Sequence, residues 1–179
     1  MKRNKHQSEV DFKMMSFFFK VRDTFKSPLE KVRKAKIEEG FHVLDYGCGP
    51  GSYTVVAAEK VGPKGRVYAA DIHPLALEKV KERAVKKGLQ NIDVIQTDCY
   101  TNLDNESIDV IMCFDVFHDI MDKSDLLKEF HRVLKSNGTL SFDDHHLKEE
   151  EIITLITSEK LFKLSEKQDK QFNFIKLIE

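Results

Sequence analysis

The sequence predicts an α/β protein, a three-layer αβα sandwich around an open, mostly parallel sheet of seven strands. Three observations predict it. Short apolar runs alternate with helix-like segments from residue 41 to residue 142, as in parallel sheets that helices cover on both sides. The run 108–114 is almost entirely apolar, which is typical of a strand buried on both faces. The last two runs, 161–165 and 172–178, lie too close together for a parallel crossover and are expected to form an antiparallel hairpin.

The chain has the size and composition of one domain with a packed core. It has 179 residues, of which 41% are hydrophobic, and we expect residues 1–179 to form a single domain. No apolar run approaches the about 20 residues that a membrane span needs. The 29 Lys and Arg nearly balance the 30 Asp and Glu, so no global field attracts phosphate backbones. Composition therefore favours neither a membrane nor a nucleic acid as partner.

Cysteine usage and the N-terminus predict a cytoplasmic protein. The cysteines are odd in number, and no pair has the spacing of a zinc clip or a redox motif. Each lies beside an apolar segment, so we expect small buried thiols in a reducing compartment. They are Cys48, Cys99 and Cys113. The basic residues 1–6 are followed by Glu9 and Asp11 rather than by the apolar core of a secretory signal.

Residues 1–38 are expected to form a helical cap on a core of residues 39–179. The first helix carries a dense apolar cluster, which consists of Val10, Phe12, Met14, Met15, Phe17, Phe18, Phe19 and Val21. The cluster is open to three interpretations, a lid over a ligand, a cover of the sheet or a dimer face. A second helix is expected from Ser27-Pro28, an N-cap and first-turn pair, to Gly40. Its basic stretch, 26–36, is expected to be a solvated face.

The core is expected to alternate strands and helices, separated by Gly and Pro. The helix 74–87, for example, places Leu77, Val80 and Ala84 on one face and stops at Gly88. The helix 124–134 is expected to stop around Asn137-Gly138. Strands are expected at 41–46, 66–70, 92–96, 108–114, 139–142, 161–165 and 172–178, with a charged turn at 166–170. Helices are expected at 52–61, 74–87, 124–134 and 149–158.

The most informative segment is a glycine-rich loop between the first strand and its helix, residues 43–54. Ligands of open α/β sheets bind beyond the carboxyl ends of the strands, and the glycines let a ligand lie against bare backbone. Carboxylates stand at the ends of four successive strands, and these are Asp45, Asp71, Asp98 and Asp115. Asp45 is well placed for a cationic group and badly placed for a pyrophosphate. Asp71 lies about twenty residues past the loop, which suits a carboxylate that binds ribose hydroxyls.

These motifs resemble those of the class I S-adenosylmethionine-dependent methyltransferases of the small-molecule type. Residues 44–51 are similar to the family's first motif, acid-x-G-x-G-x-G, and Asp71 with Ile72 to the acidic and apolar residues after its second strand. Residues 108–118 resemble its fourth-strand motif. Residues 131–140 resemble its R-x-L-K-P-G-G-x-L segment, although Ser136 and Asn137 replace Pro and the first Gly at a turn.

The resemblance implies a Rossmann-like fold with strand order 3-2-1-4-5-7-6 and S-adenosyl-L-methionine as cofactor, with S-adenosyl-L-homocysteine as its product. Asp45 is expected at the amino end of the cofactor, Asp71 at the ribose, Ile72 against the adenine, and Asp98 with the Cys99 amide at the adenine edge. The implied cofactor-binding residues are Asp45, Gly47, Cys48, Gly49, Gly51, Asp71, Ile72, Asp98, Cys99 and Asp115.

Three histidines follow the fourth and fifth strands, where an acceptor is expected. They are His118, His145 and His146. One of them is a candidate base or acceptor-positioning group, and the alternative is that all three are ordinary loop residues. Together with Asp143 they are also candidates for a metal site. Their spacing is not diagnostic, and we predict no metal.

The sequence therefore predicts an enzyme that methylates a small molecule, one that is apolar or aromatic if the N-terminal cluster is a lid. Residues 115–118 lack the [Asn/Asp]-Pro-Pro-aromatic pattern of methyltransferases that act on the amino groups of bases or on glutamine amides. This absence and the neutral charge argue against a nucleic-acid substrate. A homodimer stays open. Two alternatives remain, an NAD-dependent oxidoreductase on a dinucleotide fold and a protein that binds S-adenosylmethionine without catalysis.

Overall fold

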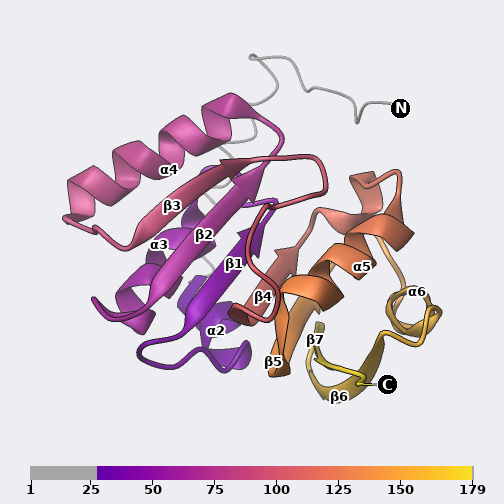
Figure 1. Ribbon diagram of the computed structural model, residues 1–179. Coiled ribbons are helices and arrows are strands. Elements are labelled where there is room, and N and C mark those ends of the chain that lie inside the picture. Colours follow the sequence, from indigo (N-terminus) through magenta and orange to yellow (C-terminus); the bar gives the residue numbers. More distant parts are fainter. Residues whose placement is uncertain (1–27, 179) are drawn as a thin grey trace.

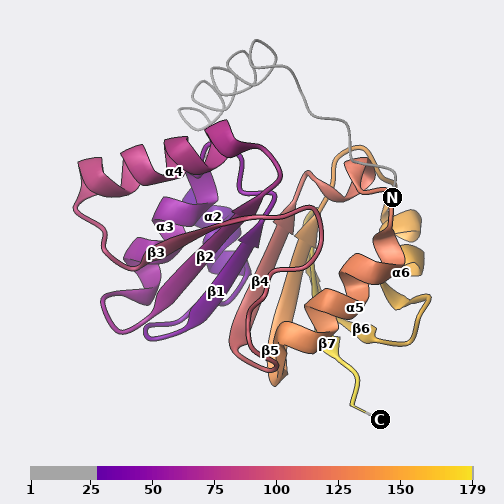
Figure 2. The same cartoon turned by 45° about the horizontal axis from the view of Figure 1, so that its top comes forward.

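The computed structural model describes residues 28–178, and these form one seven-stranded sheet between two layers of helices (Figures 1 and 2). The order is β3-β2-β1-β4-β5-β7-β6, as predicted, with β7 antiparallel to both β5 and β6. The described helices are α2 (Pro28–Lys34), α3 (Ser52–Val61), α4 (Pro74–Lys87), the 3₁₀ turn η1 (Phe117–Asp119), α5 (Lys123–Val133) and α6 (Glu149–Thr157). The strands are β1 (His42–Tyr46), β2 (Arg66–Asp71), β3 (Ile92–Gln96), β4 (Ile108–Phe114), β5 (Leu134–Asp143), β6 (Phe162–Gln168) and β7 (Gln171–Lys176).

Two apolar cores flank the sheet because successive side chains of a strand point to opposite faces. On β1, Val43 packs with α2 and α3, whereas Leu44 and Tyr46 pack with α5 on the other face. The helix α4 continues the first layer and packs on β2 and β3. The central strand β4 is buried at six of its seven positions, which explains its nearly unbroken apolar sequence.

The structure corrects three expected boundaries. The helix α2 ends at Lys34 and the chain turns at Lys36, where φ is 56°, rather than continuing to Gly40. The strand β5 begins at Leu134, directly after α5, and not at residue 139. Its register against β4 shifts by an irregular step after Leu134, so the Asn137-Gly138 pair lies in a bulge instead of a turn. The final hairpin turns at residues 169–170 alone, since β6 runs to Gln168.

The predicted N-terminal helix, with its Phe and Met cluster, and the predicted N-cap Ser27 lie outside the described residues. Between residues 28 and 178, none of the helices has the length and apolar character needed to cross a membrane.

Candidate functional site

The candidate site lies at the carboxyl ends of β1, β2, β4 and β5, where the loops that follow the parallel strands converge (Figure 1). The chain leaves β1 toward β2 on one side, while β4 pairs with β1 on the other. The strand order therefore reverses beside β1, and open α/β sheets bind their ligands at such a reversal.

The glycine loop after β1 is tied to its neighbours on both sides. The amides of Gly47 and Cys48 donate to the Ala70 carbonyl at 2.8 and 3.0 Å. Gly47 has a φ of 74°, and a Cβ there would lie 2.5 Å from the Val116 side chain, so only glycine fits. Gly51, also at positive φ, precedes the first residue of α3. The loop is thus held between the end of β2 and the segment that follows β4.

Asp71 joins the glycine loop to the end of β2. Its Oδ2 accepts from the Gly49 amide at 2.9 Å and its Oδ1 from the His73 amide at 2.8 Å. Burial raises the pKa of this carboxyl, and the backbone amides of His73 and Gly49 oppose that effect. An ionised carboxylate has about four acceptor sites. Since each oxygen uses one for an amide, the group can also accept from a pair of neighbouring hydroxyls, as a ribose presents them.

Asp45 lies beneath the glycine loop and is 2% exposed. Its Oδ2 accepts from the Thr54 hydroxyl of α3 at 2.5 Å. Burial raises the pKa of Asp45 to about 7, because Thr54 offers hydrogen bonds but no positive charge. The observed contact joins the end of β1 to the first turn of α3, and the role of Asp45 at the cofactor's amino end stays a prediction.

The loop after β3 carries the predicted adenine-binding residues. Asp98 is exposed and lies two residues beyond the end of β3. The Cys99 amide donates to Thr97 Oγ1 at 3.1 Å, so it would have to exchange this bond to bind an adenine. Further along, the buried Glu129 of α5 accepts from both the amide and the hydroxyl of Thr101, at 2.9 and 2.6 Å. Glu129 was not predicted, and it fixes this loop to the rest of the core.

Beyond β4, Asp115 pairs with His145 and with a lysine from α2. Asp115 Oδ1 accepts from the His145 amide at 3.0 Å and lies 2.7 Å from His145 Nδ1. Lys31 Nζ lies 3.8 Å from Asp115 Oδ2 and 3.1 Å from Asp143 Oδ2. His145 and Lys31 hold the pKa of Asp115 below its usual value against the effect of burial. Lys31 therefore belongs to the site, and the expectation of a solvated face is wrong for this lysine, whereas Arg33 and Lys36 are exposed as expected.

Asp144, which was not singled out from the sequence, organises the remaining two histidines. Its side chain has no exposed surface, and its oxygens accept from the amides of His118 and His146, both at 3.0 Å. The His118 Nδ1 lies 3.0 and 2.9 Å from the two oxygens. The His146 ring lies against both other rings, with centroids 4.0 Å from His118 and 3.9 Å from His145. The three predicted histidines thus form one cluster.

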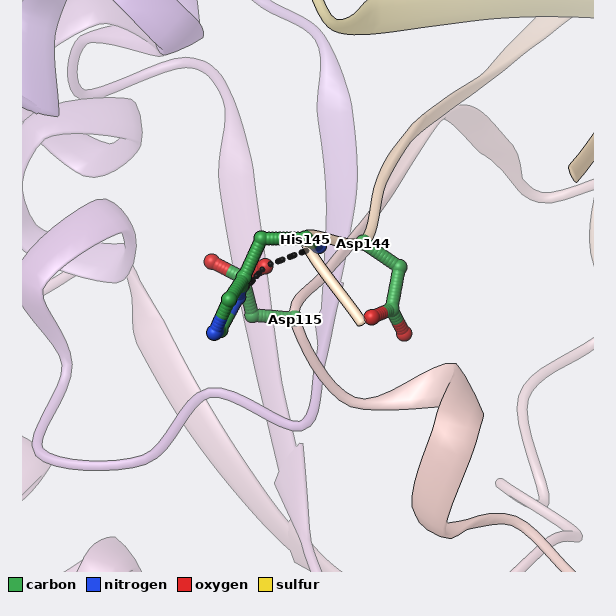
Figure 3. Close-up of side chains that lie close together, drawn as sticks. All are labelled: Asp115, Asp144 and His145. Carbon is green, nitrogen blue, oxygen red and sulfur yellow. Dashed lines mark hydrogen bonds and ion pairs between the residues drawn. The ribbon is translucent and has the colours of Figure 1, made fainter. Parts of the chain in front are cut away.

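Asp115, Asp144 and His145 offer ligand atoms that all lie within 4.8 Å of one another (Figure 3). The structure nevertheless favours internal pairing over a metal ion. Figure 3 shows the Asp144 carboxylate directed away from the Asp115–His145 pair. The oxygens of Asp144 already accept from His118 and His146, and the Lys31 ammonium lies beside Asp115.

Comparison with known proteins identifies the family. Residues 37–176 match a family model described as a methyltransferase domain. The chain belongs to the class I S-adenosylmethionine-dependent methyltransferases. This family assignment confirms the predicted resemblance and S-adenosylmethionine as the cofactor, and it does not favour an NAD-dependent oxidoreductase. The carboxylate of Asp71 beside the glycine loop fits that cofactor, because it can accept from ribose hydroxyls.

Individual relatives of this methyltransferase are distant. Demethylmenaquinone methyltransferase of Geobacillus stearothermophilus is 30% identical over 108 residues, 60% of this chain and 46% of that protein. Aklanonic acid methyltransferase of Streptomyces sp. (strain C5) is 34% identical over 104 residues, 58% and 47% of the two proteins. The chain spans about half the length of the curated relatives it matches. A methyltransferase structure from Aquifex aeolicus, 24% identical, aligns with a TM-score of 0.75 over 86% of this chain and 90% of that one, which supports the fold.

Proposed function

We propose that this protein binds S-adenosylmethionine over the carboxyl ends of β1 and β2 and transfers its methyl group to a small molecule held over β4 and β5. The observation that carries the proposal is Asp71, whose two oxygens bridge the Gly49 amide and the His73 amide. This geometry leaves acceptor sites for two hydroxyls next to a loop of bare backbone. The family's methyl donor carries both a ribose and a positive charge, and Asp45 and Asp71 are anionic when ionised.

The roles of the chain's own residues follow from their positions. The bound cofactor supplies a methyl group that is already activated by its sulfonium. Asp71 binds the ribose, Gly47 and Gly49 permit close approach, and Asp45 balances the cationic amino end. Asp98 and Ile72 contact the adenine. The protein mainly has to align the acceptor with the methyl group and exclude water.

The relatives named for demethylmenaquinone and aklanonic acid support a small-molecule acceptor. The rings of His118, His146 and His145 lie tilted against one another, and such a group of rings supports an acceptor with an aromatic or otherwise flat apolar surface, which can pack on ring faces. Nucleic acid stays disfavoured by the near-neutral charge. We also propose a cytoplasmic location, which the three free cysteines support. A homodimer is a prediction that light scattering of the full chain checks.

Calorimetry with S-adenosylhomocysteine, S-adenosylmethionine and NAD tests the cofactor. We expect the first two to bind and NAD not to bind. Asp71→Ala is expected to weaken the affinity for S-adenosylhomocysteine by about 10- to 100-fold, since hydrogen bonds to a charged group contribute about 1.5–3 kcal/mol. Asp93→Ala is the matched control, because Asp93 is a carboxylate in the neighbouring strand that pairs with Arg66 at the surface. Binding of NAD, or equal affinities of the wild type and Asp71→Ala, would contradict the assignment.

Catalysis is tested separately with S-adenosylmethionine labelled in its methyl group and a pool of small metabolites. We expect the wild type to transfer the label to a small molecule and Asp71→Ala to transfer it to the same molecule more slowly. Tight cofactor binding with no transfer to any member of the pool would favour the alternative of a protein that binds S-adenosylmethionine without catalysis.

A further inference from the structure

His118 and Asp144 form a polar pair at the site that several contacts hold in place. The Asp144 side chain is fully buried, whereas the His118 side chain keeps 23% of its surface exposed. Two hydrogen bonds join the pair, because Asp144 accepts from the His118 backbone amide and from its ring nitrogen Nδ1. A second amide, that of His146, fixes the same carboxylate from the other side. The His118 ring therefore has little freedom to turn.

This arrangement determines which ring nitrogen can take up a proton. A carboxylate can only accept, so the Nδ1 of His118 must carry the hydrogen. The neutral ring then presents the lone pair of Nε2. The exposed carboxylate of Asp119 lies 3.5 Å from that nitrogen. Asp144 thus lies on the Nδ1 side of the ring and Asp119 on the Nε2 side.

The position of His118 links it to the cofactor loop. His118 lies in η1, two residues after Val116, and the Val116 side chain packs directly against Gly47. The short segment 115–118 thus runs from the glycine loop to the histidine cluster. A molecule that is held at the ends of β4 and β5 is bordered by the cofactor loop on one side and by the His118 ring on the other.

We propose that His118 is the base that removes the proton from a hydroxyl-bearing acceptor, and that Asp144 is its positioning residue. This inference rests on the proposed methyl-transfer function. The acceptor's O–H proton moves to Nε2 of His118, and the oxygen forms a bond to the methyl carbon. The bond from that carbon to sulfur breaks, and its electron pair returns to the sulfur, which changes from sulfonium to thioether. The imidazolium, stabilised by Asp144, then gives its proton to water.

The substrate class follows from the same chemistry. A phenol or enol, whose pKa resembles the value near 10 of a tyrosine, is mostly protonated at neutral pH and is a weak nucleophile until it loses its proton. Such acceptors gain most from a base whose pKa lies near the working pH, as that of an imidazole does. A thiolate or a preionised acid does not need one.

His131 provides the matched control. Its ring is also held by a hydrogen-bond contact, because its Nε2 lies 2.9 Å from the Leu177 carbonyl oxygen, and it packs against Phe162. It stands near the end of α5, and Leu177 follows β7, which runs antiparallel to β5, so His131 lies at the edge of the sheet opposite the site. His118→Gln and His131→Gln therefore each remove one partly buried histidine ring, and only the first removes the proposed base.

The test uses the full chain, S-adenosylmethionine labelled in its methyl group, and two acceptors of similar shape, 2-naphthol and 1-nitro-2-naphthol. The nitro group makes the second acceptor the stronger acid. We expect His118→Gln to lower kcat on 2-naphthol by about 10²- to 10³-fold, in the range of general-base contributions, and to affect the nitro compound much less. His131→Gln is expected to leave kcat close to that of the wild type, because His131 lies away from the site.

Asp144→Asn tests the positioning role. An amide cannot hold the ring as a carboxylate does, so kcat is expected to fall by at least about tenfold with little change in KM. Equal rates for His118→Gln and the wild type, equal losses on both naphthols, or no transfer from the wild type to either naphthol while the cofactor still binds would each overturn the proposal. Failure to bind the cofactor would instead overturn the proposed function. Circular dichroism and S-adenosylhomocysteine affinity show whether each variant keeps its fold.

Discussion

Asp45 is expected to make the free protein less stable as the pH rises, and Asp45→Asn should remove this dependence. The side chain is 2% exposed, and burial raises its pKa to about 7 from an ordinary value of 3.8. Because the folded state holds this proton more tightly than the unfolded state, the stabilisation is complete at acid pH and is lost between about pH 4 and about pH 7. Three pKa units at 1.36 kcal/mol each give about 4 kcal/mol in total, of which about 2–3 kcal/mol falls between pH 5 and pH 8.

Urea unfolding of the wild type and Asp45→Asn at about pH 5 and about pH 8, without cofactor, measures this difference. The asparagine can still accept from the Thr54 hydroxyl, and it carries no charge at either pH. We expect the stability of Asp45→Asn relative to the wild type to increase by about 2–3 kcal/mol on going to the higher pH. Other titrating groups change both proteins alike and cancel. If the two proteins change stability in parallel, Asp45 does not carry the raised pKa and the reasoning fails.

Two further predictions concern the loops that frame the cofactor. Gly47→Ala is expected to lower the free energy of unfolding by several kcal/mol, because its Cβ would lie 2.5 Å from the Val116 side chain at a φ of 74°. It is also expected to lower the affinity for S-adenosylhomocysteine. Gly40→Ala, at a φ of 83° with nothing within 4 Å, should cost only the about 1–2 kcal/mol of the left-handed conformation, and thermal unfolding with calorimetry compares the two. Glu129→Ala is expected to lower the free energy of unfolding, measured with urea, by about 2–3 kcal/mol, because Thr101 loses the buried acceptor of its amide and hydroxyl. The same variant is expected to bind S-adenosylhomocysteine more weakly. Glu82→Ala, which breaks an exposed pair with Lys79, should change stability by less than about 1 kcal/mol, and a similar loss in both variants would count against the anchoring role of Glu129.

Local signals predicted most of the fold, and non-local pairing explains the main error. The helices 52–61 and 74–87 have the bounds expected of them, because Gly and Pro mark their ends. The start of β5 was predicted at residue 139, since Asn137-Gly138 resembles a turn. In the structure Leu134 pairs with Ile108 of β4 before a bulge. The two strand residues that pair there lie 26 residues apart in the sequence, so a local sequence pattern cannot predict their pairing.

The same distinction applies to the candidate site. The glycine loop and Asp71 were predicted because their spacing in the sequence is itself the signal. Asp144 and Lys31 were not, although both make central contacts, since Asp144 meets His118 across 26 residues and Lys31 meets Asp115 and Asp143 across still longer separations. Lys31 stands in a basic stretch that resembles a solvated face. Only the packing of α2 against the end of the sheet brings its ammonium over the rings of Tyr53 and Phe114 and beside Asp143.

The distribution of charge along this edge of the sheet supports a division between cofactor and acceptor. Over β4 and β5, each carboxylate already has a basic side chain as partner: Lys31 for Asp143, His118 for Asp144, and both His145 and Lys31 for Asp115. Over β1 and β2, the described hydrogen bonds of Asp45 and Asp71 come from a hydroxyl and backbone amides, and burial raises both pKa values. A cationic ligand gains most at carboxylates whose pKa is raised, because it replaces the proton they would otherwise retain. The sulfonium cofactor is therefore favoured over β1 and β2, and a neutral hydroxyl-bearing acceptor is better suited to the paired charges over β4 and β5.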